Sequence, residues 1–204
     1  SPQLGFYKRR SHDIVSIDDC PVAMGALSPV ITAVKAWMRE TGVEPYSEET
    51  HHGLLRHVIV RTVRDGSLMV LLVATSESLP DTAGLVARLQ AGVPGFQALH
   101  VSENRMHNNV ILGKTCRKLF GTDAIFETLL GLSFEISPLS FFQVNPVQTE
   151  KLYGTAIAYA ALTPGDTVVD AYAGAGTISL CMAKACKRVI GLEIVPQAVE
   201  SAIR

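Results

Sequence analysis

The sequence predicts an α/β protein in which an α+β domain, residues 1–137, precedes the first part of a parallel α/β fold, residues 138–204. Two observations support this prediction. Near the C-terminus, an apolar segment ends in an acid, a glycine loop and a helical pattern follow, and a second apolar segment ends near a second acid. Upstream, helical stripes and short strand-like segments are typical of a separate α+β unit.

The N-terminal domain is expected to contain a helix and a hairpin. Ser28 as cap and Pro29 at the first helical position open a helix with an apolar stripe. Strands over residues 55–63 and 68–74 flank an Asp-Gly dipeptide, which is a strong hairpin signal. These elements supply the first layer and the first strands of the domain.

Further elements are expected along the same domain. A second helix is predicted over residues 81–90 from apolar residues spaced for one face. Strands near residues 97–102, 110–112 and 132–136 would extend an antiparallel sheet. Residues 133–140 are the expected hinge into the second domain.

The glycine loop near the C-terminus is expected to approach a ligand closely. Gly174 and Gly176 have no Cβ in the way, and Thr177 is placed to cap the helix that follows. The third glycine of a dinucleotide fingerprint would fall on Ser179, which weakens the case for NAD. Glycine-rich turns between a strand and a helix also occur as packing turns, so the flanking acids decide the interpretation.

Two acids beside the loop discriminate between ligands. Asp170 immediately precedes the loop, where it would repel an anionic pyrophosphate and tolerate a sulfonium cation. Glu193 lies about 20 residues beyond the loop, at the tip of the second strand, where a carboxylate can accept hydrogen bonds from both ribose hydroxyls. The pair favours S-adenosylmethionine over a dinucleotide.

A second motif lies upstream of the glycine loop. Asn145 as N-cap, Pro146 at the first helical position and Gln148 three residues after the cap form a capping-box start. Two phenylalanines and Gln143 come directly before it. In one interpretation the phenylalanines pack into the core and the Gln143 amide forms hydrogen bonds with backbone groups. In the other, the Gln143 amide contacts the cofactor or the edge of a base.

With these motifs the chain resembles the RNA (uracil-5-)-methyltransferases, which use S-adenosylmethionine to methylate carbon 5 of uridine in transfer or ribosomal RNA. The run from Ile136 to Gln148 resembles the 23S ribosomal-RNA enzymes more than the transfer-RNA enzymes. The resemblance rests on seven segments, which cover the chain with gaps: SFFQVN at 140–145, DAYAGAGTIS at 170–179, GLEIVPQA at 191–198, GFYKRRSHDIV at 5–15, DCP at 19–21, GLLRHV at 53–58 and NVILG at 109–113.

The resemblance implies a Rossmann-like class I methyltransferase fold and a set of cofactor contacts. Carried over by position, these contacts fall on Gln143, Tyr172, Thr177 and Glu193, with Gly174 and Asp170 in the same loop region. Tyr172 would lie along the methionine or adenosine portion, and Glu193 would hold the ribose. The chain departs from the family at Ala173, where cysteine is common, and at Ala175, where a larger residue is common.

The resemblance also implies chemistry that this sequence does not supply. Carbon 5 of uracil is a poor nucleophile, so in the family a cysteine thiolate first adds to carbon 6 and a base later removes the carbon-5 proton. In the family both residues lie C-terminal to the part of the fold seen here. We therefore expect the chain to be a truncated piece of a longer enzyme and to be inactive by itself, with no catalytic residue of its own.

The four cysteines are not expected to fill that role. Cys181 and Cys186 are expected in the helix after the glycine loop as small buried thiols. Cys116 lies in a basic stretch that could lower its pKa, although a partly buried bystander is the simpler reading. Some family members hold an iron–sulfur cluster, and Cys20 before Pro21 matches its fourth ligand; the other three are absent, so only a longer parent protein could complete the cluster.

Composition indicates a soluble cytoplasmic protein whose partner is RNA, by the resemblance 23S rRNA, and not a membrane. The chain is 48% hydrophobic, its net charge is −1, and it has no secretion signal or apolar run of membrane-spanning length. RNA binding must then come from local patches. The best candidate patch, which could equally be a solvated basic turn, comprises Phe6, Lys8, Arg9, Arg10 and His12, with Tyr7 beside them.

Two other functions are compatible with the sequence. A nicotinamide-dependent oxidoreductase fragment would bind NAD, although Asp170 and Ser179 argue against it. A non-catalytic RNA-binding module would bind RNA without the cofactor. His51, His52 and His57 are close in sequence, but without a carboxylate constellation they are expected to be hydrogen-bonded or to face RNA rather than to bind a metal. Oligomeric state is open, since an incomplete sheet exposes a strand edge.

Overall fold

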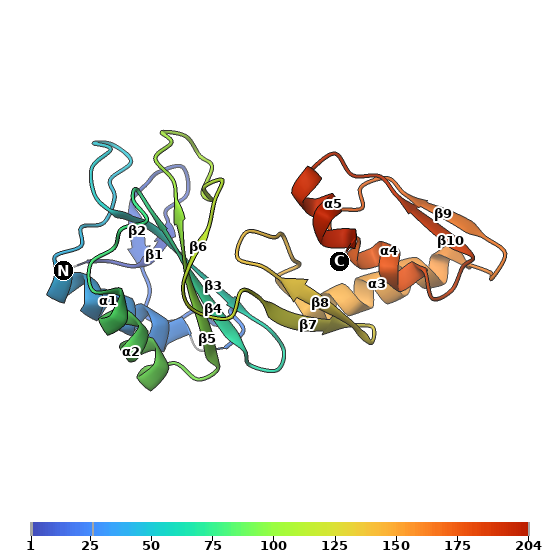
Figure 1. Cartoon of the computed structure of the whole chain (residues 1–204), viewed down its shortest axis with the longest axis horizontal. Coiled ribbons are helices and arrows are strands. Elements are labelled where there is room, and N and C mark those ends of the chain that lie inside the picture. Colours follow the sequence, from blue (N-terminus) through green and yellow to red (C-terminus); the bar gives the residue numbers. More distant parts are fainter. Residues whose placement is uncertain (1, 26, 204) are drawn as a thin grey trace. The chain divides into compact units, whose positions relative to one another are not determined.

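The computed structural model describes residues 2–25 and 27–203 and divides into two compact units, which we describe separately (Figure 1). Unit 1 ends at Ile125 and unit 2 begins at Phe126. The domain boundary predicted after residue 137 thus falls beyond a β-hairpin that the structure groups with unit 2. Residues 133–140, the predicted hinge, include a strand of that hairpin.

Unit 1 contains a mixed four-stranded sheet with the order β3-β4-β5-β6. The antiparallel sheet predicted from sequence is wrong at one position, because β4 and β5 pair in parallel. Helix α2 connects these two strands and returns the chain to the same end of the sheet, which a parallel pair requires. The strands are β3 (Leu55–Thr62), β4 (Leu68–Ala74), β5 (Phe96–Glu103) and β6 (Arg117–Gly121).

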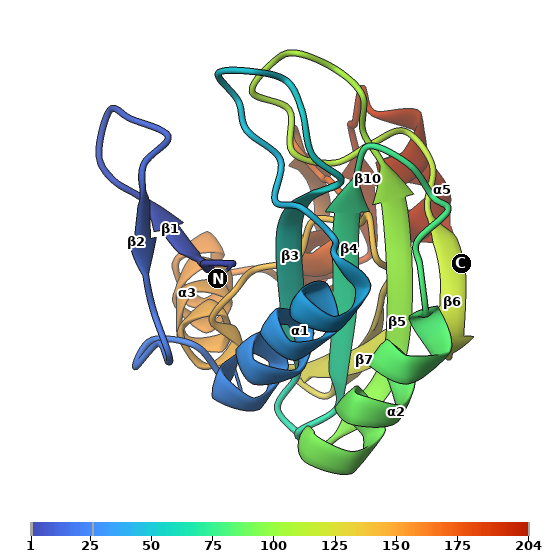
Figure 2. The same cartoon turned by 90° about the vertical axis from the view of Figure 1, so that its left-hand side faces the viewer.

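Helices α1 (Leu27–Thr41) and α2 (Thr82–Gly92) cover one face of this sheet (Figure 2). Their apolar residues pack with Leu72 and its neighbours into the main core, where Trp37 is 1% exposed. The Trp37 indole Nε1 donates to the carbonyl of Pro80 at 2.9 Å, so the one polar atom of the ring is satisfied. This layer gives unit 1 a rigid scaffold.

Two local predictions for unit 1 are wrong. Residues 110–112 form a loop, not a strand, because the Asn104 side chain donates to the carbonyls of Val110 and Ile111 and ties the backbone into a turn. Strand β6 takes the expected place in the sheet. Ser28 lies inside α1, which is assigned from Leu27, and is therefore not the residue before the helix.

A short antiparallel hairpin precedes α1. It consists of β1 (Gly5–Tyr7) and β2 (Ile14–Ser16), with Phe6 paired to Val15. The turn is closed by the Lys8 amide, which donates to the carbonyl of Asp13 at 2.8 Å. The basic residues of the sequence patch therefore lie on the tip of a defined hairpin.

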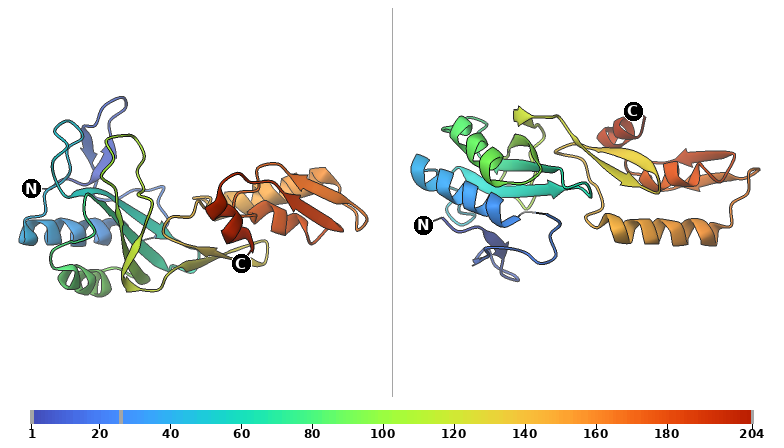
Figure 3. Two further views of the ribbon diagram at one scale, coloured as in Figure 1. Left: turned by 45° about the horizontal axis from the view of Figure 1, so that its top comes forward. Right: turned by 90° about the horizontal axis from the view of Figure 1, so that it is seen from below.

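Unit 2 combines a hairpin with a parallel β-α-β unit (Figure 3). Its small core joins Leu129 and Phe134 of the hairpin with Tyr153 of α3 and Cys181 of α4. Strands β9 and β10 pair in parallel, with Asp170 opposite Gly191, and confirm the predicted α/β class. The elements are β7 (Ile125–Leu129), β8 (Leu132–Ile136), α3 (Pro146–Ala160), β9 (Thr167–Asp170), α4 (Thr177–Met182), β10 (Arg188–Gly191) and α5 (Pro196–Ile203).

Candidate cofactor site

The glycine loop joins β9 to α4 at the carboxyl end of the parallel strands, where ligands bind in open α/β sheets. Gly174 and Gly176 have φ angles of 55° and 76°, in the left-handed region that favours glycine. Gly176 is the residue before α4, and no side chain caps this helix. The first turn of α4 is therefore not capped by a side chain.

Thr177 does not cap α4 as the sequence suggested. It is the first residue of the helix, and its hydroxyl lies 2.7 Å from the Tyr153 hydroxyl of α3. Tyr153 is 7% exposed, so this contact ties the start of α4 to the core of unit 2. The Thr177 hydroxyl therefore forms a hydrogen bond with another side chain of the protein.

Glu193 follows β10 and faces the glycine loop. One carboxylate oxygen, Oε2, accepts from the Gly174 amide at 2.8 Å. The other, Oε1, accepts from the amides of Ile194 at 2.8 Å and Val195 at 2.7 Å. The amides of Val195 and Gly174 lower the pKa of Glu193 from its ordinary value, so the carboxylate is ionised at neutral pH.

Both carboxylate oxygens of Asp170 accept hydrogen bonds from other groups of the chain. Its Oδ2 accepts from the Ser179 hydroxyl at 2.6 Å, and its Oδ1 accepts from the Tyr172 amide at 3.3 Å. Ser179, which replaces the third glycine of a dinucleotide fingerprint, thus has a defined structural partner. The contact fixes the start of the loop against α4.

A cavity of about 930 Å³ opens between the loop, α4, the end of β10 and α5. Its wall is largely apolar, and the Glu193 carboxylate is the only acidic group among its described lining residues. Tyr172 lies at its edge and is 93% exposed. The lining residues are Ala171, Tyr172, Ala173, Gly174, Gly176, Ser179, Leu180, Ala183, Val189, Gly191, Leu192, Glu193, Ile194, Val199 and Ala202.

The structure brings together some of the predicted cofactor residues. Tyr172, Gly174 and Glu193 line the cavity, and Asp170 contacts its lining residue Ser179. Gln143 and Thr177 are not among the lining residues; Gln143 is exposed in the segment before α3.

Sequence reasoning also missed the apolar wall contributed by Leu180, Ile194 and Val199. The helical spacing of Gly176, Leu180 and Ala183 could have indicated the α4 part of that wall.

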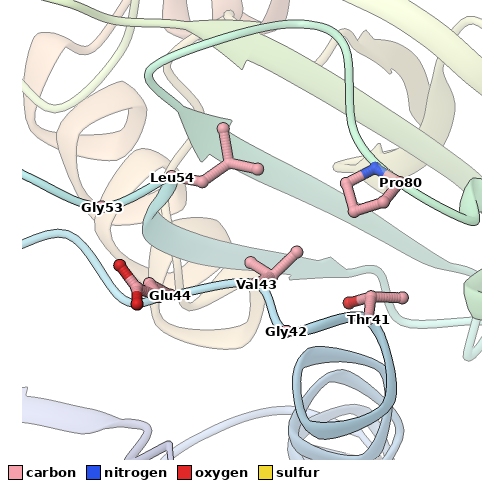
Figure 4. A pocket seen from close by; sticks show the side chains of 7 residues that line it. All are labelled: Thr41, Gly42, Val43, Glu44, Gly53, Leu54 and Pro80. Atoms are coloured by element: carbon pink, nitrogen blue, oxygen red, sulfur yellow. The ribbon is translucent and has the colours of Figure 1, made fainter.

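Unit 1 has a smaller hollow of about 310 Å³ near the end of α1 (Figure 4). Figure 4 shows Val43 and Leu54 as apolar side chains of its wall and Glu44 as its one acid. The Thr41 hydroxyl donates to the Trp37 carbonyl at 2.7 Å and is thus satisfied within the helix. Among the residues that line this hollow, Thr41 and Glu44 carry the polar side chains.

The cysteines do not form a reactive centre. Burial, followed by the charge of Glu77, raises the pKa of Cys116 to about 11, and burial also raises the pKa of Cys181. The basic neighbours of Cys116 therefore do not activate it. Cys186 lies beyond α4, not within the predicted helix, because α4 ends at Met182.

A metal site is not formed by the side chains that the structure describes, among which no group of three or more histidine, cysteine, aspartate or glutamate residues comes together. Cys20 is half-buried and has a free thiol. Its proposed role as an iron–sulfur ligand therefore concerns only a longer parent protein.

The basic patch of the sequence lies on the hairpin β1–β2, and its residues Phe6, Lys8, Arg9, Arg10 and His12 are all exposed. The rings of Tyr7 and His12 meet edge to face, with centroids 5.3 Å apart. Arg10 has a φ angle of 62°, which places it at the tight turn of the hairpin. The patch is therefore a structured turn open to solvent.

Comparisons with known proteins give relatives over nearly the whole chain. The chain is 42% identical over 201 residues to an uncharacterized RNA methyltransferase of Halalkalibacterium halodurans, a match that covers 98% of this chain and 44% of the relative. It is 39% identical over 201 residues to an uncharacterized RNA methyltransferase of Clostridium acetobutylicum, with the same two coverages. The chain thus spans less than half the length of these relatives. No family model matches the chain.

Among solved structures, the chain is similar to the tRNA (uracil-54, C5)-methyltransferase of Pyrococcus abyssi in complex with S-adenosyl-L-homocysteine. The TM-score is 0.78 at 28% identity, and the match covers 94% of this chain and 46% of that one. This similarity confirms the methyltransferase-type α/β fold. No helix in the described part of the chain is long and apolar enough to cross a bilayer.

Proposed function

Because the chain is homologous over nearly its whole length to bacterial proteins named RNA methyltransferases, we propose that it is part of an S-adenosylmethionine-dependent enzyme that forms 5-methyluridine in RNA. The observation that carries the proposal is the cavity at the glycine loop with the Glu193 carboxylate at its wall. The fold similarity to a tRNA uracil-5 methyltransferase supports the choice of base. The resemblance of residues 136–148 to the ribosomal-RNA enzymes favours 23S rRNA as the substrate.

The residues of the cavity fit the proposed cofactor. The apolar wall formed by Leu180, Val189 and Ile194 suits an adenine ring, and the loop at Gly174 lets the backbone approach the rest of the molecule. The bound cofactor would supply an electrophilic methyl group on a sulfonium centre. Glu193, ionised at neutral pH, would both attract this cation and accept from the ribose.

The hydrogen bonds of Glu193 set a condition on cofactor binding. A carboxylate offers about four lone-pair sites, and the amides of Gly174, Ile194 and Val195 already use three of them. One ribose hydroxyl can be accepted at the free site of Oε2. A second can be accepted only if one of the three backbone amides shares or releases its oxygen, so cofactor binding should loosen one of these three contacts.

Methyl transfer to carbon 5 of uracil by the proposed route requires a cysteine nucleophile, and the described residues that line the cavity include none. None of Cys20, Cys116, Cys181 and Cys186 is among the described lining residues, and burial raises the pKa of Cys116 and Cys181. We expect the nucleophile and the base to come from other parts of a longer enzyme. The chain alone should bind the cofactor without transferring its methyl group.

The test is isothermal titration of S-adenosylhomocysteine into the wild-type chain and the Glu193→Gln variant. We expect the wild type to bind and the variant to bind about tenfold more weakly, because a charged acceptor is lost. Glu200→Gln, an exposed acid on α5, is the matched control and should bind like the wild type.

NAD serves as the ligand of the competing oxidoreductase hypothesis. We expect NAD not to bind, since the Ser179 hydroxyl donates a hydrogen bond to the Asp170 carboxylate at the point where a pyrophosphate would approach. Binding of NAD without S-adenosylhomocysteine, or equal S-adenosylhomocysteine affinity for wild type and Glu193→Gln, would contradict the proposed cofactor site. Far-ultraviolet circular dichroism verifies that each protein is folded.

A further inference from the structure

Three loops lie together at one end of the sheet of unit 1, as both Figure 1 and Figure 2 show: the hairpin turn 8–13, residues 47–53 and residues 104–113. The hairpin that carries the first of these loops contacts strand β3 through the rings of Tyr7 and His57, whose centroids are 6.3 Å apart. We propose that these loops form one binding face for single-stranded RNA, with the paired rings of His51 and His107 as its base-stacking platform. This inference rests on the proposed action on RNA.

The two histidines are stacked in a defined way. Their ring centroids are 3.9 Å apart and their planes differ by 3°. Both side chains are exposed, although they come from loops far apart in the sequence. The Tyr46 hydroxyl lies 3.0 Å from Nδ1 of His51 and orients that ring. An oriented, exposed aromatic surface of this kind can stack on a nucleobase.

The loop of residues 47–53, which carries His51, is held in place by its own backbone. The amide of His51 donates to the Ser47 carbonyl, and the Ser47 amide donates to the His52 carbonyl, both at 2.8 Å. His51 has a φ angle of 57°, an uncommon conformation for a residue other than glycine. The tight turn therefore fixes the ring outside the core at some conformational cost.

The loop of residues 104–113, which carries His107, is held by two buried polar side chains, Arg56 and Asn104. Arg56, whose side chain is 1% exposed, donates to the carbonyls of Asn104 at 3.1 Å and Met106 at 2.7 Å and pairs with Glu48 at 2.9 Å. Its guanidinium also lies 4.3 Å from the centre of the Tyr46 ring. Arg56 thus ties the loop that carries His107 to the loop that carries His51.

Asn104 supports the loop of residues 104–113 from within the loop itself. It is 2% exposed, its amide donates to the carbonyls of Val110 at 2.6 Å and Ile111 at 2.9 Å, and its Oδ1 accepts from the Met106 amide. The loop tip nevertheless leaves Met106, Val110 and Ile111 between 48% and 60% exposed. A loop that is internally satisfied but exposes apolar side chains is prepared for a partner and loses little entropy on binding.

The chemistry of the face favours RNA as that partner. The hairpin turn supplies Lys8, Arg9 and Arg10, which can contact phosphates, while the histidine pair offers a flat surface to bases. Exposed Asn108 and Asn109 add amide donors and acceptors beside the stack. An apolar protein partner would not need this combination of cations and stacked rings.

The experiment measures fluorescence anisotropy of a labelled, unstructured, uridine-rich RNA titrated with the whole chain. His107→Ala should weaken the Kd about tenfold because the stacking surface is lost. His107→Phe should retain most of the affinity, since it preserves a ring that can stack, which a merely structural role of the imidazole would not explain. Gln90→Ala, at an exposed position of α2 outside the three loops, is the control and should leave the Kd unchanged.

The cationic part of the face has a separate readout. Replacing Lys8 and Arg9 by alanine should flatten the dependence of Kd on salt concentration, because fewer counterions are released on binding. His107→Ala should keep the wild-type salt slope. Both variants should unfold at the wild-type midpoint, followed through the fluorescence of Trp37 in the core of unit 1.

The inference is overturned if the wild type does not bind the RNA, or if folded His107→Ala binds it as tightly as the wild type. That failure differs from failure of the proposed cofactor site, which is read from S-adenosylhomocysteine titration. His107→Ala should bind S-adenosylhomocysteine like the wild type, because His107 belongs to unit 1 and the cavity to unit 2.

Discussion

The sheets of unit 1 and unit 2 bury their strands to very different extents. All seven residues of β4 are buried, between helices on one side and neighbouring strands along both edges. In β9 and β10 no residue is fully buried, and Val169 is 58% exposed. The first sheet is a scaffold that holds loops in place, while the second is an open surface beside the cavity at the glycine loop.

The difference extends to the loops that each sheet supports. In unit 1, buried Arg56 and Asn104 fix the loops through several hydrogen bonds each. In unit 2, the loop geometry depends on the surface carboxylate of Glu193 and on the contact between Asp170 and Ser179. We infer that the loops of unit 1 proposed to bind RNA are prearranged and that the glycine loop would adjust if the proposed cofactor binds there.

The largest expected effect contrasts the two sheets directly. Leu72→Ala removes a fully buried side chain of β4 and should lower the free energy of unfolding of unit 1 by about 3 kcal/mol, because it leaves a cavity. Val169→Ala in β9 should change the stability of unit 2 by less than about 0.5 kcal/mol. Urea unfolding followed by Trp37 fluorescence measures the first, since Trp37 is the single tryptophan.

Hydrogen exchange of β9 and β10 measures the second substitution. If Val169→Ala destabilised these strands as strongly as Leu72→Ala destabilises β4, the contrast between a closed and an open sheet would be wrong.

A smaller effect is expected at the start of α3. Asn145 Oδ1 accepts from the Gln148 amide at 3.0 Å, so Asn145→Ala should destabilise this helix by about 1 kcal/mol. Faster hydrogen exchange in the first turn of α3, with unit 1 unchanged, is the expected result. Asn145→Asp keeps an acceptor at the same place and should restore protection; failure to do so would argue against the cap.

The contact between α3 and α4 should contribute slightly less. Tyr153→Phe removes the hydroxyl that meets Thr177 and should cost about 0.5–1 kcal/mol in unit 2, because one hydrogen bond is lost. It should also weaken S-adenosylhomocysteine binding modestly, since the start of α4 follows the glycine loop. Tyr159→Phe is the control, because Tyr159 is 86% exposed on the same helix. Equal behaviour of the two variants would show that the contact does not support the site.

The smallest effect concerns pH and unit 1. Burial, followed by the charge of Arg56, lowers the pKa of His57 from its ordinary value of 6.5, so the folded state favours the neutral ring. Above pH 6.5 the His57 ring is neutral in both the folded and the unfolded chain, so the stability of unit 1 has its full value. As the pH falls below 6.5 the unfolded chain takes up the proton first, and stability declines until the folded pKa is reached.

Thermal unfolding between pH 7.5 and 5 should show this decline, and His57→Gln should reduce it in part. The pKa of His100 is also lowered, mainly by burial, so some pH dependence should persist. An unchanged profile in His57→Gln would mean that His57 does not carry the effect.

Local motifs were predictable from the sequence because their determinants lie within a few residues. The acid, glycine loop and helix after β9 and the Asn145 cap of α3 are of this kind, and the structure contains both. The parallel pairing of β4 with β5 was not predictable, since pairing direction depends on how the whole of α2 folds back.

Side-chain partners across the sequence were equally hidden. The Thr177 hydroxyl was expected to cap its own helix, but Tyr153 occupies it from the preceding helix. The pairing of His51 with His107 also joins residues from two separate loops. Neither contact leaves a periodic or local signal that sequence reasoning can use.

The main core of unit 1 has a consequence for how the protein is made. All of its residues precede the hairpin β7–β8, so this core can form while residues 126–203 are still being synthesised. Unit 2, with its exposed apolar strands, would emerge from the ribosome next to a neighbour that is already folded. The order of synthesis thereby limits the number of unfolded apolar segments that are exposed at one time, and with it the opportunity for intermolecular strand pairing.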